Sequence, residues 1–278
     1  MDPSLRSNGS SNRPTVQAPI RGVAHSRVAG RVDRVLNTAM AGERAAVLNV
    51  TASELLAEPV PISRTLGAAL GRPGVGIIGH WMVQELLRRS NLHSDLLNAL
   101  TSPNPLTRAA AARICAAARM TDSVLWLGDL VRDKNPAVRA AAVRALAQLG
   151  GRRAVDILMA SRDVIPQYRL AIALAQAATD VDIEALMRKP EDEKVAVATV
   201  LACGLRGDVL RVSPLLGIAH DRRWPIPVRK AACKALATIG DRSAADGLKR
   251  LALYDPDTDV KDAADRAHLR LVKRAVAQ

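Results

Sequence analysis

The sequence predicts an all-α fold, a right-handed solenoid of about six helix hairpins closed by a C-terminal capping helix. A short phrase, proline followed by an aliphatic residue and arginine, opens one alanine-rich stretch after another, as in Pro136-Ala137-Val138-Arg139 and Pro227-Val228-Arg229. The basic residue of the phrase recurs at 108, 139, 169, 229 and 261, at spacings of 31, 30, 60 and 32 residues. A period near thirty residues is typical of stacked supersecondary units, and the gap of 60 predicts a degenerate copy around Lys194.

The unit over 136–160 shows how each repeat is built. Proline suits the first turn of a helix, where its missing N–H would have no partner. The apolar stripe that follows consists of Val138, Ala141, Ala142, Ala145, Leu146 and Leu149. Gly150 and Gly151 end this helix, and a second helix offers Val155, Ile157 and Leu158 to the same core. Neither helix can bury its stripe alone, so neighbouring hairpins must cover both.

The same pattern extends along the chain. The predicted hairpins span 76–101, 104–132, 136–160, 164–188, 191–220 and 226–253, and a last helix spans 259–276. We therefore predict a repeat solenoid over 76–278. Residues 30–75 have an irregular helical pattern that predicts an N-terminal cap or an extra pair of helices.

The first 29 residues differ in composition from the rest of the chain. They are rich in Ser, Asn and Pro, and too few apolar side chains are present to offset the entropy of ordering. Residues 1–35 carry six Arg against Asp2 and Asp33, a net charge of +4. We expect a disordered basic head over 1–29, and the sequence leaves open whether it is a solvated tail, a basic arm or a targeting segment.

These repeats resemble the HEAT-repeat family, in short bacterial forms similar to the phycobilisome-lyase-type repeats. The matching residues are Pro136, Val138, Arg139, Ala142, Leu146 and Gly150, and again Pro227, Val228, Arg229, Ala232, Leu236 and Gly240. The resemblance covers about 76–276 and implies an α-solenoid with first helices on the convex side and second helices on the concave side. It implies no single activity, because a fold does not fix a function.

Composition narrows the class of protein. Phe is absent and aromatic residues total 2%, so the core is expected to be thin and aliphatic. No apolar run approaches the roughly 18 residues that span a membrane, and the N-terminus lacks the apolar core of a signal peptide. The three cysteines, Cys115, Cys203 and Cys233, lie far apart, which predicts buried reduced thiols and a cytoplasmic protein.

Enzyme constellations are not evident in the sequence. The five histidines are scattered, and none is adjacent to Glu, as the HEAT-fold di-iron hydroxylases would require. The run from Gly74 to Gly79 fits G-x-G-x-x-G, but no strand is predicted before it, so a hinge is favoured over a dinucleotide site. The sequence predicts no catalytic residue, no metal ligand and no cofactor, and it favours a non-catalytic protein. A lyase or another enzyme acting on a small molecule remains an alternative.

Basic residues supply the remaining signal, since 40 Lys and Arg against 27 Asp and Glu give a net charge of +13. The family resemblance implies a structural ladder that pairs with acids in the turns, such as Asp133 and Asp163, and joins repeat to repeat. The ladder consists of Arg108, Arg139, Arg169, Lys194, Arg229 and Lys261. Five residues further along, Arg113, Arg144, Lys234 and Arg266 form a row that would face the convex side.

A second basic set belongs to the second helices and their flanks and is our predicted partner-binding surface. It consists of Arg152, Arg153, Arg188, Lys189, Arg211, Arg222, Arg223, Trp224, Lys249 and Arg250, with Trp224 as an exposed anchor. Acidic residues alternate with this basic set and interrupt what would otherwise be a continuous positive stripe. This interruption favours protein over nucleic acid as the partner. The sequence therefore predicts a scaffold or adaptor for a protein with an acidic surface, with nucleic-acid binding through basic groove residues as the alternative.

Overall fold

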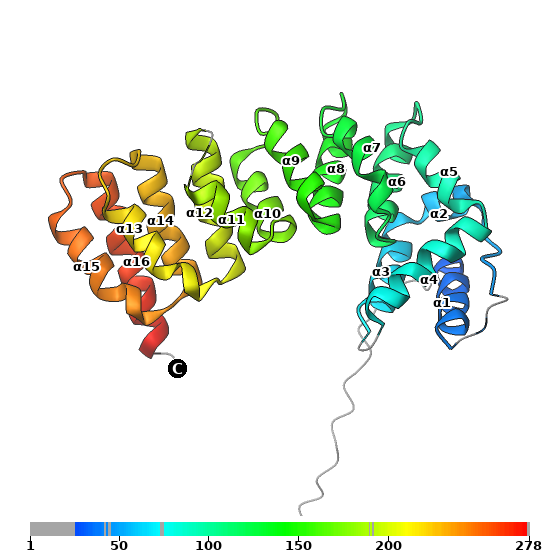
Figure 1. Cartoon of the computed structure of the whole chain (residues 1–278), viewed down its shortest axis with the longest axis horizontal. Helices are drawn as coiled ribbons and strands as arrows, with labels where there is room; N and C mark the ends of the chain where they lie inside the picture. The colour runs from blue at the N-terminus through cyan, green and yellow to red at the C-terminus, as the bar shows by residue number, and fades with distance from the viewer. Residues whose placement is uncertain are drawn as a thin grey trace, which may run out of the picture.

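The computed structural model describes residues 26–41, 43, 46–72, 75–188, 190 and 192–276, and this part of the chain contains helices and no strands (Figure 1). The predicted all-α solenoid is confirmed. Most of the expected basic head, residues 1–25, lies outside the described residues, as does Lys189 of the predicted partner-binding set.

The helices follow the predicted hairpins. The hairpins pair α4 (Gly76–Arg89) with α5 (Leu92–Ala99), α6 (Pro105–Ala117) with α7 (Val124–Leu130), α8 (Pro136–Leu149) with α9 (Arg152–Ala160), α10 (Gln167–Ala177) with α11 (Asp180–Arg188), α12 (Glu193–Arg206) with α13 (Val212–His220), and α14 (Ile226–Ile239) with α15 (Ala245–Tyr254). The last helix is α16 (Thr258–Val276), and α1 (Arg27–Met40), α2 (Ala52–Ala57) and α3 (Pro59–Leu70) precede the hairpins. Three short 3-10 helices lead into second helices: η1 (Thr121–Ser123), η2 (Val209–Arg211) and η3 (Arg242–Ala244).

The recurring phrase acts as a helix-start signal. The side-chain oxygens of Asn104 and Asn135 accept hydrogen bonds from the backbone N–H groups of Leu106 and Ala137, at 2.9 and 2.8 Å. A proline in the first turn follows in both helices, where its ring costs no hydrogen bond. These local signals explain why helix starts are readable from the sequence.

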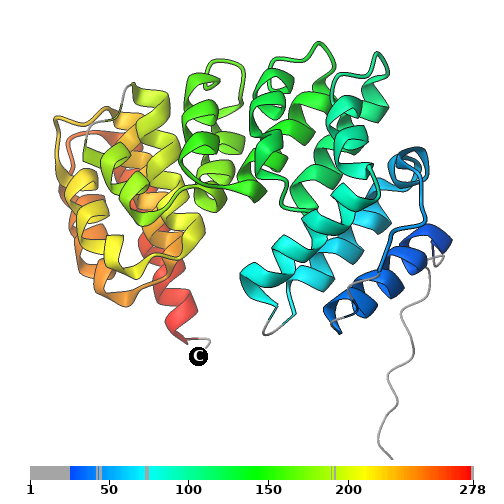
Figure 2. The ribbon, with the colours of Figure 1, turned by 45° about the vertical axis from the view of Figure 1, so that its right-hand side comes forward.

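The helices form two layers, and the first helices form the inner one. Helices α3, α6, α8, α10, α12, α14 and α16 pack directly on one another in that order, whereas neighbouring second helices meet much less closely. In a curved stack the closer-spaced layer lies on the inside of the bend. The stack forms an arch whose two ends turn toward the same side (Figures 1 and 2).

A contact across the arch supports this assignment. The Nζ of Lys234 on α14 lies 5.3 Å from the ring centroid of Tyr168 on α10, although α12 stands between these two helices. Side chains two helices apart meet most readily on the concave side. The expectation that second helices line the concave side is therefore wrong, and the row containing Arg113 and Arg144 faces the inner side rather than the convex one.

The N-terminal end departs from the regular pattern. The hairpin predicted over 76–101 forms, but α3 rather than α4 packs on α6 and continues the inner layer. Helix α4 instead leaves Ile77, Ile78 and Trp81 exposed.

Arginines and aspartates join neighbouring repeats. Arg108 binds Asp133 through two hydrogen bonds of 2.8 and 2.9 Å, whereas Arg139 donates to the backbone carbonyls of Asp133 and Lys134. Asp163 pairs with Arg132 rather than with a ladder residue. Among the described residues, Arg169, Lys194 and Lys261 form no ion pair, so the ladder is complete at only some of its positions.

The Arg229–Asp255 pair is the most deeply buried of these contacts, with side chains only 4% and 3% exposed. Arg229 also donates from Nε to the backbone carbonyl of Ala219 at 2.9 Å. Burial alone raises the pKa of Asp255, but hydrogen bonds from Arg229 and from the backbone N–H of Asp257 outweigh it and hold the pKa below its usual value. A lowered folded-state pKa means that Asp255 stabilises the fold above about pH 4, the usual carboxylate range, and that this contribution is lost as the pH falls through the lowered value.

Removing one partner of this pair should destabilise the protein strongly. We expect Arg229→Met to lower the free energy of unfolding by about 3–5 kcal/mol, because Asp255 would stay buried without its partner. The double variant Arg229→Met/Asp255→Leu should recover most of that loss in urea denaturation. A single variant as stable as the wild type would contradict this role.

The approach of α12 to α14 leaves no room for one extra carbon. A Cβ built on Gly204 would lie 2.7 Å from the Cα of Ala235. We expect Gly204→Ala to lower the unfolding free energy by about 1–3 kcal/mol. The matched control is Gly217→Ala in α13, where nothing lies within 4 Å, and which should raise stability by about 0.5–1 kcal/mol. Thermal unfolding of both variants measures the contrast, and a shift in the same direction for both would refute the packing argument.

Candidate functional site

The predicted partner-binding residues lie on the outer layer and in the turns, and about half of them already bind acids. Arg152 pairs with Asp156 and Asp182 at 3.0 and 3.4 Å. The other pairs in the set are Arg188 with Glu184, Arg211 with Asp208, and Arg223 with Asp221. Arg153, Arg222, Lys249 and Arg250 are exposed. The use of this set as a binding surface stays a prediction.

Trp224 does not have the exposure expected of an anchor. Its side chain is partly buried and packs against the hydrophobic core. The sequence placed it beside two arginines in a loop, but periodicity gives no information on how a loop residue turns.

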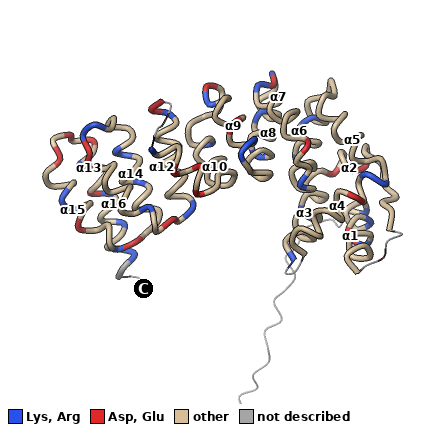
Figure 3. Tube along the Cα trace, viewed as in Figure 1, with Lys and Arg blue, Asp and Glu red and all other residues tan. Residues whose placement is uncertain are grey.

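Charge is divided between the two layers. The first helices from α3 to α14 (α3, α6, α8, α10, α12 and α14) contain eleven Lys or Arg and one acidic residue, Glu193. The second helices from α5 to α15 contain five basic and seven acidic residues. This partition can be followed along the trace in Figure 3. Acids outside these first helices pair with four of the eleven cations: Arg108, Arg206, Arg229 and Lys230. The other seven form no ion pair with a described residue, so the first helices still carry more uncancelled positive charge than the second helices.

One basic cluster lies near the N-terminal end of the inner face. Arg64, Arg113 and Arg144 line a hollow of about 400 Å³ between α3, α6 and α8, and its lining includes no acidic residue. Partial burial of the guanidinium and the like charges of Arg113 and Arg169 lower the pKa of Arg144. The fold thus holds this cation among like charges.

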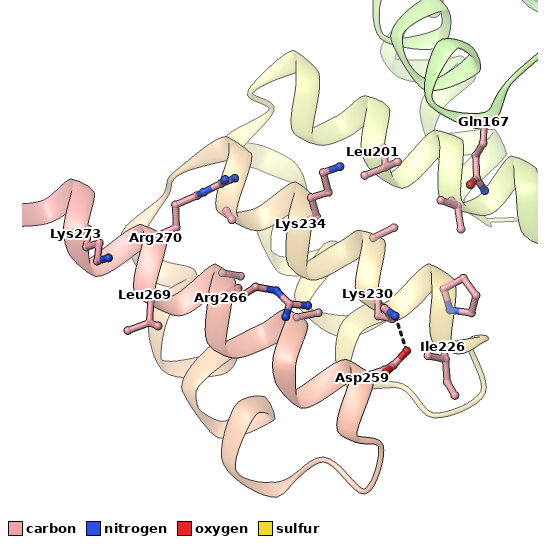
Figure 4. Close-up of a pocket in the computed structure, with 16 residues that line it drawn as sticks. Gln167, Leu201, Ile226, Lys230, Lys234, Asp259, Arg266, Leu269, Arg270 and Lys273 are labelled. Carbon is pink, nitrogen blue, oxygen red and sulfur yellow. Dashed lines mark hydrogen bonds and ion pairs between the residues drawn. The ribbon is translucent and has the colours of Figure 1, made fainter.

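A larger groove lies at the C-terminal end of the inner face, across α12, α14 and α16 (Figure 4). Its volume is about 960 Å³, and its walls carry five cations, Lys230, Lys234, Arg266, Arg270 and Lys273. One acid, Asp259, lines the groove and pairs with Lys230 at 2.5 Å. Gln167 of α10 and nine apolar side chains complete the lining, the apolar ones being Val197, Leu201, Ile226, Pro227, Ala231, Ala237, Ala263, Ala267 and Leu269. We call this site the C-terminal groove.

Sequence reasoning found only part of this groove. Lys234 and Arg266 were expected on the opposite, convex side, and Lys230, Arg270 and Lys273 were not singled out. The near absence of acids from the first helices was the signal that could have identified the groove. That signal becomes visible only when residues are sorted by helix layer instead of by charge along the chain.

The described residues contain no catalytic arrangement that we can identify. No group of three His, Cys, Asp or Glu side chains in this part of the chain could hold a metal ion. The three cysteines are free and buried, and burial raises the pKa of Cys115 and Cys233 to about 12 and that of Cys203 to about 11, so these thiols are poor nucleophiles. Helix α3 precedes the G-x-G-x-x-G run, and the part of it that is described opens helix α4, which is not the strand and turn of a dinucleotide site. The exposed cations of the inner face create a positive field, which attracts anionic groups.

The position of Arg144 among like charges should lower the free energy of unfolding by a measurable amount. We expect Arg144→Gln to raise the free energy of unfolding at low salt by about 0.2–0.5 kcal/mol, because it relieves repulsion with Arg113 and Arg169. The gain should shrink in about 1 M salt, where screening acts over about 3 Å. Urea denaturation at the two salt concentrations measures it, and a clear loss of stability at low salt would show that Arg144 has a structural role.

Comparison with protein families identifies the repeats. No curated protein matches the chain. Among solved structures, human deoxyhypusine hydroxylase in complex with glycerol is 15% identical over 88% of this chain and 97% of that chain, with a TM-score of 0.35. An engineered protein is 18% identical over 87% of this chain and 96% of its own, with a TM-score of 0.31. The family profile described as HEAT repeats matches residues 94–178 and 181–267, together more than half of the sequence. The chain therefore belongs to the HEAT-repeat family.

Proposed function

We propose that this protein is a non-catalytic binding scaffold whose inner face holds a protein partner with an acidic surface. The observation that carries the proposal is the division of charge, one acidic residue against eleven basic ones on the first helices from α3 to α14. A concave surface of one sign attracts ligands of the opposite sign and speeds their association. No helix in the described residues is long and apolar enough to cross a membrane. The free thiols support a reducing compartment, and we propose the cytoplasm.

The middle of the inner face favours protein over nucleic acid. Ile172 on α10 is 37% exposed, and Leu201 on α12 is partly exposed and lines the C-terminal groove. The Tyr168 ring lies under Lys234. Aliphatic side chains between two basic clusters suit the mixed surface of a protein, whereas a phosphate backbone is held mainly by cations along its length.

Nucleic-acid binding is the second candidate, because the same division of charge would attract phosphates. The two candidates differ in their salt dependence. Binding to phosphates weakens steeply and linearly on a logarithmic salt scale, by about 0.9 logarithmic units per phosphate contact for duplex DNA. A protein interface with an apolar centre keeps much of its affinity as salt rises.

Affinity capture from native lysate, with and without nuclease, tests the proposal. The inner-face variant Arg113→Glu/Arg144→Glu/Arg270→Glu is compared with the outer-face variant Arg153→Glu/Arg222→Glu/Lys249→Glu, which makes the same change in charge. We expect the wild type and the outer-face variant to retain a nuclease-resistant stoichiometric protein, and the inner-face variant to bind it at least about tenfold more weakly, a loss of about 1.4 kcal/mol.

Three results would count against the proposal. Loss of the partner from the outer-face variant alone would show that the second helices form the binding surface. Equal retention by both variants would exclude the basic surfaces altogether. Recovery of nucleic acid, with co-purifying proteins lost after nuclease, would replace the proposal with the second candidate.

A further inference from the structure

The C-terminal groove has two rows of cations that belong to two neighbouring helices. Lys230 and Lys234 are four residues apart on α14, and Arg266 and Arg270 are four residues apart on α16, with Lys273 one turn further (Figure 4). Four residues of α-helix advance about 6 Å along the axis. Each row therefore presents positive charge at intervals of about one helical turn.

Most of this charge has no counter-ion in the described part of the chain. Asp259 pairs with Lys230 and lies close enough to Arg266 to feel its charge, and Lys234 rests over the Tyr168 ring. Arg270 and Lys273 form no ion pair with any described residue. The other two acids of α16, Asp262 and Asp265, do not line the groove. A net excess of four cations thus faces one hollow.

The rest of the groove lining is mainly apolar, and several of its side chains are small. Ala231 on α14 and Ala263 and Ala267 on α16 line the groove together with the cations, and Val197 and Leu201 on α12 add apolar surface. Leu269 and Ile226 also line the groove and are 47% and 41% exposed. Small side chains leave room above them, so an apolar stripe of a ligand can approach closely while its flanks meet the cations.

We propose that the C-terminal groove is a docking site for an acidic amphipathic helix of the partner protein. This inference rests on the proposed function and specifies the partner's chemistry. In a helix, an apolar stripe at i, i+3, i+4 and i+7 has side chains on both flanks, and acidic residues four apart repeat at the same interval of about 6 Å as the cations. In an extended strand, neighbours of an apolar anchor point to the opposite face, so acids beside the anchor would turn away from both rows. A helix meets both rows at once.

Fluorescence polarisation with a labelled synthetic peptide tests the proposal on the full-length protein. The probe is a hydrocarbon-stapled helix of about five turns, with leucines along one stripe and glutamates on both flanks. Three controls accompany it: the same peptide with every Glu replaced by Gln, an unstapled peptide of the same composition with a central proline, and an oligothymidylate of equal charge. We expect the stapled acidic peptide to bind at least about tenfold more tightly than each control.

Protein variants locate the binding. Lys234→Gln/Arg270→Gln removes two charges from the groove, and Arg153→Gln/Lys249→Gln removes two from the outer layer. All four side chains are exposed, so we expect both variants to fold. The groove variant should bind the stapled peptide at least about tenfold more weakly, and the control variant should stay within about twofold of the wild type.

Several results would overturn the inference. Equal losses in the two variants would show attraction to net charge rather than docking in the groove. Equal binding of the proline peptide would show that the ligand need not be helical. Stronger binding of the oligothymidylate would show that the groove prefers phosphates. Failure of the stapled peptide to bind, while lysate capture still depends on the inner face, would overturn this inference and leave the proposed function intact. Loss of inner-face dependence in the capture experiment would overturn the proposed function itself.

Discussion

Close packing of the first helices through alanine is the constraint on which the rest of the structure depends. Ala142, Ala232 and other small side chains are fully buried between helices, and Gly204 lets α12 approach the backbone of Ala235. The second helices carry larger side chains and meet less closely. This difference in spacing curves the stack, and the curvature turns the exposed side chains of the first helices toward a common interior. The C-terminal groove and the cluster around Arg144 both exist because of that bend.

The distribution of acidic residues follows from the same architecture. Acids of the second helices and turns bind arginines of their own and neighbouring repeats, as in the pairs of Arg132 with Asp163 and Arg162 with Asp192. These contacts stabilise interfaces between hairpins. Four cations of the first helices form such pairs as well: Arg108, Arg206, Arg229 and Lys230. The other seven cations of the first helices from α3 to α14 form no ion pair with a described residue, so they stay available to an external anion. The two layers thus differ in their use of charge: the acids of the outer layer and turns stabilise the stack, and the unpaired cations of the inner layer form the proposed binding surface.

Much of the fold could be predicted from the sequence because its signals are local. The Asn-Pro start at 135–136 and the glycines at 150–151 act within one or two turns, and the period near thirty residues fixes the number of hairpins. The side of the bend could not be predicted in the same way, because an apolar stripe shows which face of a helix is buried but not how closely neighbouring stripes approach. Periodicity also did not show that α3 would displace α4 from the inner layer, or that Trp224 would fold back on the core. The groove residues could not be predicted either, because Lys230 and Arg270 lie far apart in sequence and share one groove only once α16 packs on α14.

The nearest-neighbour construction of the stack has a mechanical consequence. Each hairpin touches mainly the hairpins before and after it, so no single core fixes the distance between the two ends of the arch. Small rotations at successive interfaces add up along the stack and change the distance between the two ends of the arch. The width of the concave side therefore depends on the sum of many small angles between neighbouring hairpins rather than on any one contact.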